Sequence, residues 1–260
     1  MRNLKFPLMF TASMLCLAML AGCSSGGGTG QPVAAVDKSA GTVELKLTFP
    51  ALGRIASVPK TPGAKTRAFG GNIPLGTKVV KLVVTNTATG AIVASRDVAG
   101  PTVATTGNLP SLVTVNFPAI PAGSYKVDAT AFPDSRATLH AIATGSATAT
   151  VQPLVTTNVI VPMSLTLSSL TIDKPTALIY TDIAPRTVVL TAIAVNATGG
   201  DLVLPLYWTT SDPGVASLSV STTDPAQVTI TGVANGTSTI TVYEPNSETV
   251  ATSVITVSSD

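Results

Sequence analysis

Apolar and polar residues alternate along much of the chain that follows residue 42. Residues 43–49 place an apolar side chain at every second position, with glutamate, lysine and threonine between them. This alternation predicts a half-buried strand. Similar short runs, separated by turn signals such as "TATG" and "PAGS", follow at 79–86, 91–98, 112–118, 123–132, 139–151 and 156–165. Short strands at this spacing predict a sandwich of about seven strands over residues 43–167.

The composition agrees with an all-β chain. Val, Thr, Ala and Ser fill the body of the sequence, whereas aromatic residues make up 4% and charged residues 11%. β-branched side chains favour strands, and glycine and proline punctuate them. With 260 residues and 45% hydrophobic content, the chain is long enough for two domains of ordinary size.

The N-terminus differs from the rest of the chain. Arg2 and Lys5 precede the apolar run 6–20, and "LAGC" then supplies small residues. This order is typical of a secretory signal, predicted here for residues 1–22, and the run is too short and wrongly flanked for a stable spanning helix. The alternative is a buried core helix, which the lack of a polar face and of a cap disfavours.

The "LAGC" stretch resembles the lipobox of bacterial lipoproteins: Leu20, two small residues, and Cys23. The resemblance implies that Cys23 receives a diacylglyceryl thioether, becomes the first residue after cleavage, and is N-acylated. Two or three acyl chains anchor a protein durably, whereas one holds it only marginally. Ser24 in this family permits transport to the outer membrane of a Gram-negative cell. We therefore expect a lipid-anchored protein of the bacterial cell envelope, placed in the outer membrane.

Residues 23–42, "CSSGGGTGQPVAAVDKSAGT", are predicted to form a flexible Gly/Ser-rich tether. Its expected span is roughly 25 Å for about twenty residues. The other cysteine, Cys16, lies inside the predicted signal. The mature chain would then hold one lipidated cysteine and no internal disulfide, so its stability must come from its cores.

Residues 120–134, "IPAGSYKVDATAFPD", resemble the P-x-G-x-Y-x-V-x-A hairpin of transthyretin-like and carboxypeptidase-regulatory-like domains. In that family the glycine permits a tight turn and the tyrosine packs inward. The resemblance implies that Tyr125, Val127, Ala129 and Ala131 share the inner face of the predicted sandwich.

Residues 168–260 resemble a bacterial Ig-like group 2 (BIG2) domain. The resemblance rests on a W-x-S-S-D-x-x-V-A pattern and on a G-x-A-x-G-T-a-x-I hairpin, carried here by Trp208, Ser211, Asp212, Val215 and Ala216 and by Gly232, Ala234, Gly236, Thr237 and Ile240. Thr210 replaces the first serine, and the segment 220–230 is longer than the family's connection, which leaves the loop geometry open.

Local chemistry within 168–260 supports a small sandwich without the family name. "NATGGD" and "GVANGT" predict turns, with Gly236 able to take φ > 0. Trp208 is predicted to fill the core; the alternative is a platform on which a sugar stacks. "SDP", residues 211–213, is predicted to cap a turn by bonding nearby amides.

The formal net charge of +2 conceals a division along the chain. Residues 37–167 hold 11 basic and 5 acidic residues, and residues 168–260 hold 2 basic and 8 acidic ones. One interpretation is that the basic half meets anionic headgroups or lipopolysaccharide phosphates; the other is chance variation between two domains. The same alternatives, an anionic partner or a solvated loop, apply to the basic loop 54–81, which holds Arg54, Lys60, Lys65, Arg67, Lys78 and Lys81.

Candidate catalytic and metal-binding residues are few. The lone histidine, His140, cannot supply a metal site by itself and is predicted to be an exposed or partly packed strand residue. The aspartates lack calcium-loop spacing, "GGGTG" lacks the strand-to-helix unit that cradles phosphate, and basic residues do not interleave with aromatics as in nucleic-acid binding. A pair of carboxylates distant in sequence stays open. We expect no enzyme, no metal and no cofactor.

These observations predict an all-β protein with two tandem Ig-like or transthyretin-like β-sandwiches, 43–167 and 168–260, after a lipoprotein signal and a flexible tether. The expected function is non-catalytic surface presentation or adhesion. Two alternatives are a carbohydrate- or exopolymer-binding module and a periplasmic accessory subunit of an envelope complex. The expected partners are the membrane, through the lipid on Cys23, and a surface polysaccharide or a protein, but no nucleic acid; the oligomeric state stays open.

Overall fold

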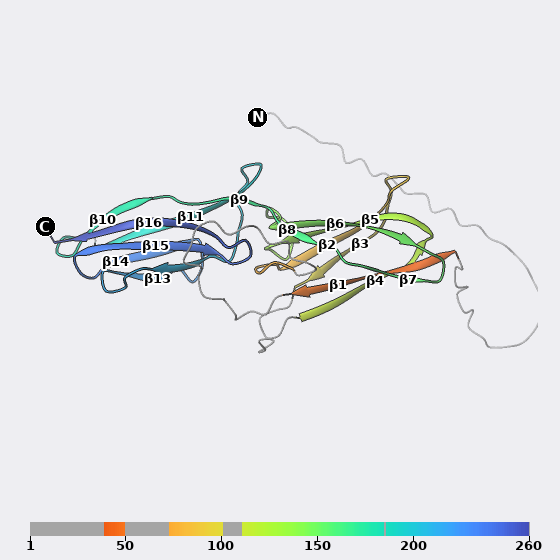
Figure 1. Ribbon diagram of the computed structural model, residues 1–260, viewed down its shortest axis with the longest axis horizontal. Helices are drawn as coiled ribbons and strands as arrows, with labels where there is room; N and C mark the ends of the chain where they lie inside the picture. Colours follow the sequence, from red (N-terminus) through yellow and green to blue (C-terminus); the bar gives the residue numbers. More distant parts are fainter. Residues whose placement is uncertain (1–38, 50–72, 101–110, 185, 260) are drawn as a thin grey trace, which may run out of the picture. The chain divides into compact units, whose positions relative to one another are not determined.

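A computed structural model describes residues 39–49, 73–100, 111–184 and 186–259, which belong to one compact unit spanning 37–260. The described residues form sixteen strands and no helix, arranged in four sheets (Figure 1). The predicted all-β class is therefore confirmed. Two sheets are built from strands before residue 166 and two from strands after it, and we call these pairs the first and the second sandwich.

The first sandwich has a three-stranded sheet of order β4-β1-β7 and a five-stranded sheet of order β3-β2-β5-β6-β8. Its strands are β1 (Ala40–Phe49), β2 (Val79–Asn86), β3 (Ile92–Ala99), β4 (Ser111–Pro121), β5 (Gly123–Phe132), β6 (Ala143–Val151), β7 (Thr156–Val159) and β8 (Met163–Leu165).

Strand β1 is the central strand of the three-stranded sheet. It pairs antiparallel with β4 and parallel with β7, and its first three residues, Ala40, Gly41 and Thr42, were predicted to belong to the tether. A Cβ atom at Gly41 would lie 2.3 Å from the carbonyl oxygen of Gln152. Glycine therefore permits the close approach of β1 to the segment that joins β6 and β7.

The inner face of β5 carries the side chains that the sequence placed there. Tyr125, Val127, Ala129 and Ala131 are all buried, as expected from a period of two. The Tyr125 hydroxyl donates a hydrogen bond of 2.8 Å to the Pro121 carbonyl, which satisfies the polar end of this buried ring. The predicted inner face is confirmed.

The connection between β5 and β6 differs from the prediction, which began a strand at residue 139. Strand β6 begins at Ala143, and His140 lies in the preceding loop with an exposed side chain. Asp134 organises this loop because its carboxylate accepts bonds from the amides of Thr138 (2.9 Å) and Leu139 (3.2 Å) and from the Thr138 hydroxyl. These local bonds compete with strand formation.

The second sandwich packs two four-stranded sheets, of orders β10-β16-β15-β12 and β13-β14-β11-β9. Its strands are β9 (Leu167–Ile172), β10 (Thr176–Tyr180), β11 (Thr187–Asn196), β12 (Tyr207–Thr210), β13 (Ala216–Val220), β14 (Gln227–Gly232), β15 (Gly236–Glu244) and β16 (Thr249–Ser258).

One pairing in the second sandwich is parallel. Strand β10 runs parallel to β16, and β16 also pairs antiparallel with β15 along its whole length (Figure 1). The last strand of the chain therefore lies inside its sheet, between an early strand and its own hairpin partner.

Trp208 lies in the core of the second sandwich, as predicted, with 8% of its surface exposed. Its indole N–H donates a hydrogen bond of 3.0 Å to the Pro225 carbonyl. Pro225 belongs to the long segment 220–230, whose shape is held by the Asp224 amide donating to the Ser221 hydroxyl. The segment that departs from the BIG2 pattern thus supplies the acceptor for the buried indole.

Both predicted turns are present. In the turn after β11, Asn196 Oδ1 accepts from the amides of Thr198 and Gly200, and Gly199 has φ 81°. Gly236 begins β15 with φ 152°, and a Cβ atom there would lie 2.9 Å from the Val215 side chain. Both positions therefore favour glycine.

Candidate functional site

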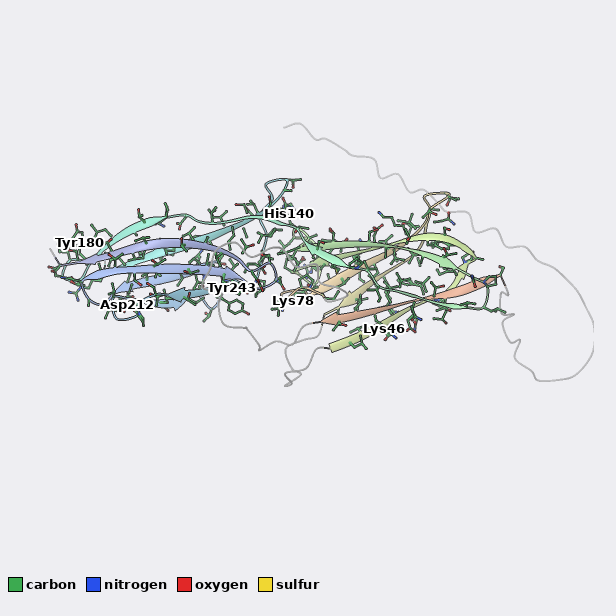
Figure 2. All side chains as sticks on the ribbon, in the orientation of Figure 1. Lys46, Lys78, His140, Tyr180, Asp212 and Tyr243 are labelled. Atoms are coloured by element: carbon green, nitrogen blue, oxygen red, sulfur yellow. The ribbon has the colours of Figure 1, made fainter. Side chains whose placement is uncertain are left out.

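Several residues singled out by the sequence lie outside the described part of the chain. These are the lipid-attachment candidate Cys23 and most of the basic loop 54–81, namely Arg54, Lys60, Lys65 and Arg67. The remaining two basic residues, Lys78 (labelled in Figure 2) and Lys81, are exposed. Lys81 lies on β2, where its cross-strand neighbour on β3 is Asp97. Lys81 therefore has an opposite charge beside it on the neighbouring strand.

His140 and the aspartates form no metal site within the described ranges, where no group of three histidine, cysteine or acidic residues is positioned to hold an ion. His140 instead lies against the backbone of Gly200, because a Cβ atom at that glycine would be 2.7 Å from the His140 Nε2 (Figure 2). Among the described residues, no helix has the length and apolar character needed to span a membrane.

The W-x-S-S-D stretch forms a hydroxyl cluster at the corner between β12 and β13. Ser238 Oγ lies 2.8 Å from the Thr210 hydroxyl, 3.2 Å from Ser211 Oγ and 3.1 Å from the Asp212 amide. The predicted cap is confirmed for Asp212, whose carboxylate accepts from the Gly214 amide at 2.8 Å. Ser211 differs, since it accepts from the Thr239 amide on β15. These groups fix a corner of the fold and use up their hydrogen-bonding capacity locally.

Trp208 cannot act as a stacking platform for a sugar, because its ring lies in the core. Next to Trp208, Tyr207 begins β12 and pairs across the sheet with Tyr243, near the end of β15. Burial, with the nearby negative charge of Glu244, raises the pKa of Tyr207. The Tyr207 phenol, whose usual pKa of 10.0 already keeps it neutral at pH 7, therefore stays protonated.

Glu244 is the charged residue that the sequence analysis missed. It is fully buried at the end of β15, yet its carboxylate accepts hydrogen bonds from Asn246 Nδ2 (2.6 Å), the Ser247 amide (2.6 Å) and the Ser247 hydroxyl (2.8 Å). Asn246 Oδ1 in turn accepts from the Leu75 amide at 2.8 Å. A buried charge persists only when it is bonded in this way. The sequence signal that could have indicated this buried carboxylate was the turn "EPNS", in which amide and hydroxyl donors follow the glutamate.

This arrangement suits a structural role for Glu244. All the acceptor bonds described above come from its own turn, and its side chain is closed to solvent. A general acid or base must reach the proton that it transfers. In the described part of the second sandwich, every other charged residue lies outside the strands.

The described residues thus define an all-β protein of two consecutive β-sandwiches. The family whose model matches the chain is described as the pilus formation protein N terminal region, and the match covers residues 209–258. These residues include β13 to β16 and the last two residues of β12. The match lies inside the range that resembles a BIG2 domain, and it is to a different family.

Solved structures similar to this chain include two of an S-layer protein. Domains 4 and 5 of SbsC are 16% identical with a TM-score of 0.32, covering 54% of this chain and 68% of that one. Domains 5–6 of SbsC are 17% identical with a TM-score of 0.27, covering 86% and 96%. Extracellular domains 3–5 of Drosophila OTK are 13% identical with a TM-score of 0.24, covering 81% and 67%. No curated protein matches the chain.

Proposed function

We propose that this chain is a non-catalytic accessory component of an assembly in the bacterial cell envelope, anchored through a lipid on Cys23. The single observation that carries the proposal is the match of residues 209–258 to the pilus formation family. Among the functions that the sequence predicted, this match favours the periplasmic accessory subunit over surface presentation or adhesion. The anchor rests on the "LAGC" stretch at residues 20–23.

The chemistry of the described residues agrees with a non-catalytic role. The buried acid Glu244 is bonded within its own turn, and the lone histidine is exposed in a loop. The matched region ends in the hairpin of β15 and β16, whose nine register pairs make it a rigid element of the second sandwich. Rigid sheets suit a component that holds other subunits at fixed positions.

The proposal is tested by the size of the particle that contains the chain in its native envelope. The full chain carrying an epitope tag after residue 260 is extracted with a mild detergent and run on a native gel. An accessory component migrates in an assembly much larger than the 26.2 kDa of the chain, and antibody reaches the tag only after the cells are lysed.

The contrary result is equally clear. A chain that migrates alone, with its tag reached by antibody on intact cells, would support surface presentation or adhesion and overturn the accessory role. A tagged lipoprotein of known periplasmic orientation in the same cells serves as the control for cell integrity.

A further inference from the structure

The outer face of the sheet β10-β16-β15-β12 presents a regular array of threonines. The register aligns three rows across the strands: Thr209, Thr241 and Thr252; Thr239, Val254 and Thr176; Thr237, Thr256 and Leu178. We call these nine residues the threonine face. Neighbouring strands lie about 4.8 Å apart, and outward residues of one strand repeat at about 6.7 Å. The array is therefore a two-dimensional lattice of hydroxyl and methyl groups.

The members of this face are available to a partner. The side chains of Thr176, Thr237, Thr252 and Thr256 are exposed, and Leu178 and Val254 expose 53% and 39% of their surface. No hydrogen bond between described residues engages the hydroxyl groups of the seven threonines. Tyr180 extends the face at the end of β10, opposite Ser258 (Figure 2).

The threonine face holds no charged residue, whereas the connections around its sheet do. Residues 168–260 include eight acidic and two basic residues, and in the described strands of the second sandwich Glu244, which is buried, is the one charged residue. Asp182 follows β10, Asp212 follows β12 and Glu248 precedes β16, while Lys174, paired with Asp173, and Arg186 lie in the connections on either side of β10. Acidic residues therefore outnumber basic ones in the connections around this sheet. Anionic polymers and anionic membranes are therefore repelled by the surroundings of the face.

The same charges disfavour a second copy of the chain, because face-to-face packing would bring two sets of acidic connections together. A cationic partner is also disfavoured, because the threonine face has no carboxylate with which it could form an ion pair. Seven hydroxyls among nine residues are also a poor cover for a purely apolar partner, whose burial would leave these hydroxyls unpaired. A partner that is uncharged and itself rich in hydroxyl groups meets each of these conditions.

We propose that the threonine face binds a neutral polysaccharide. An extended neutral glycan offers hydroxyls that exchange hydrogen bonds with the threonine hydroxyls and C–H surfaces that pack on the methyl groups, Leu178 and Val254. This proposal is independent of the accessory role proposed above, because it concerns the outer face of one sheet and not the assembly that holds the chain.

The test measures depletion of the purified full chain from solution by three insoluble neutral polysaccharides: cellulose, chitin and a β-1,3-glucan. Heparin–agarose is the anionic comparison. We expect retention on at least one neutral polymer and none on heparin. We expect the affinity to change by less than about twofold between low and high salt, since no ion pairs form.

Matched variants locate the surface. Thr252→Lys with Thr256→Lys places two charges on the threonine face, and Thr171→Lys with Thr187→Lys places the same charges at exposed positions of the opposite sheet. The face variant should lose about tenfold or more in affinity, whereas the control variant should stay within about twofold. Thermal unfolding of both variants checks that each is folded.

Three results would overturn the proposal. The parent chain could be retained by none of the three neutral polymers, or both variants could lose affinity equally. Sedimentation equilibrium could also find a dimer that the face variant abolishes while no polysaccharide is retained, which would assign the face to self-association.

Discussion

Two serines of the second sandwich, Ser238 and Ser253, are equally buried but differ in the hydrogen bonding of their hydroxyl groups. Each exposes 1% of its surface. Ser238 Oγ has three polar neighbours at the corner between β12 and β13, whereas Ser253 Oγ has no hydrogen-bond partner among the described residues. A buried hydroxyl stabilises the fold only when it is bonded.

The two serines therefore respond differently to the same substitution. Ser238→Ala leaves the Asp212 amide and the Thr210 hydroxyl without this partner, and it should lower the free energy of unfolding by about 1–3 kcal/mol. Ser253→Ala removes an unbonded polar atom and should be neutral or stabilising, by up to about 1 kcal/mol. Urea unfolding of both variants checks this, and equal losses would contradict the described geometry.

The contribution of Asp134 to the free energy of unfolding depends on pH. The Thr138 amide is the largest cause that lowers the pKa of Asp134 from its usual 3.8, and the Thr138 hydroxyl and Leu139 amide add to it. Because the folded pKa is below the unfolded one, the stabilising contribution is present above about pH 3.8 and is lost as pH falls through the folded pKa.

We therefore expect the free energy of unfolding of the parent chain to fall more steeply below pH 3.8 than that of Asp134→Asn. Thr138→Ala keeps the amide and removes the hydroxyl, so its slope should lie between the two. Denaturant unfolding measured from pH 6 down to about pH 2 provides the comparison. Identical slopes for the parent and Asp134→Asn would show that this carboxylate does not contribute.

At the scale of elements, the connection between β13 and β14 is tied to the core through Trp208. Trp208→Phe keeps a ring in the core but removes the donor to the Pro225 carbonyl, and it should lower the free energy of unfolding by about 1–2 kcal/mol. Trp208→Ala also leaves a cavity and should cost about 3–5 kcal/mol. Hydrogen exchange of the Gln227 and Ala226 amides, which bond within this connection, reports its loosening in the Phe variant. Unchanged exchange there would contradict the tie.

Strand periodicity explains why much of the fold was predictable. The alternating burial of β2 and β5 follows from valine, leucine and alanine at every second position. The parallel pairing of β10 with β16 was not predictable, because the partners are separated by some seventy residues and local pattern carries no record of them. Leu154 and Ala119 take φ of 60° and 57°, which no local glycine or asparagine signal announces.

The candidate chemistry was predicted less well than the fold. His140 was assigned to the strand predicted over 139–151, but the hydrogen bonds to Asp134 hold the preceding residues in a loop, and β6 begins only at Ala143. Glu244 was overlooked because charged residues are seldom fully buried. Its burial depends on Asn246 and Ser247, two ordinary turn residues that become donors only when the hairpin closes. The threonine face requires the register of four strands, which sequence alone does not supply.

At the scale of the whole molecule, the anchor and the folded unit are separate features. Cys23→Ser should abolish labelling of the chain with palmitate and leave a larger, unprocessed precursor, because the thiol is the acceptor that the "LAGC" resemblance implies. The mass of the chain and its label are read together from one gel. Cys16→Ser, within the predicted signal, is the matched control and should leave labelling intact. Labelling that persists in the Cys23 variant would refute the anchor.

The interior position of β16 has a consequence for the order in which the chain can fold. Synthesis runs from the N-terminus, so β10 emerges well before β16, which is its neighbour in the sheet. At about 5–20 residues per second, the roughly seventy residues between them take about 4–14 s to appear. Throughout that interval β10 has no partner in its sheet, and β15, once made, waits for its longest partner. A nascent chain interrupted before residue 249 therefore holds every strand of the sheet β13-β14-β11-β9 but lacks the strand that joins β10 to β15, and its unpaired strand edges are open to aggregation.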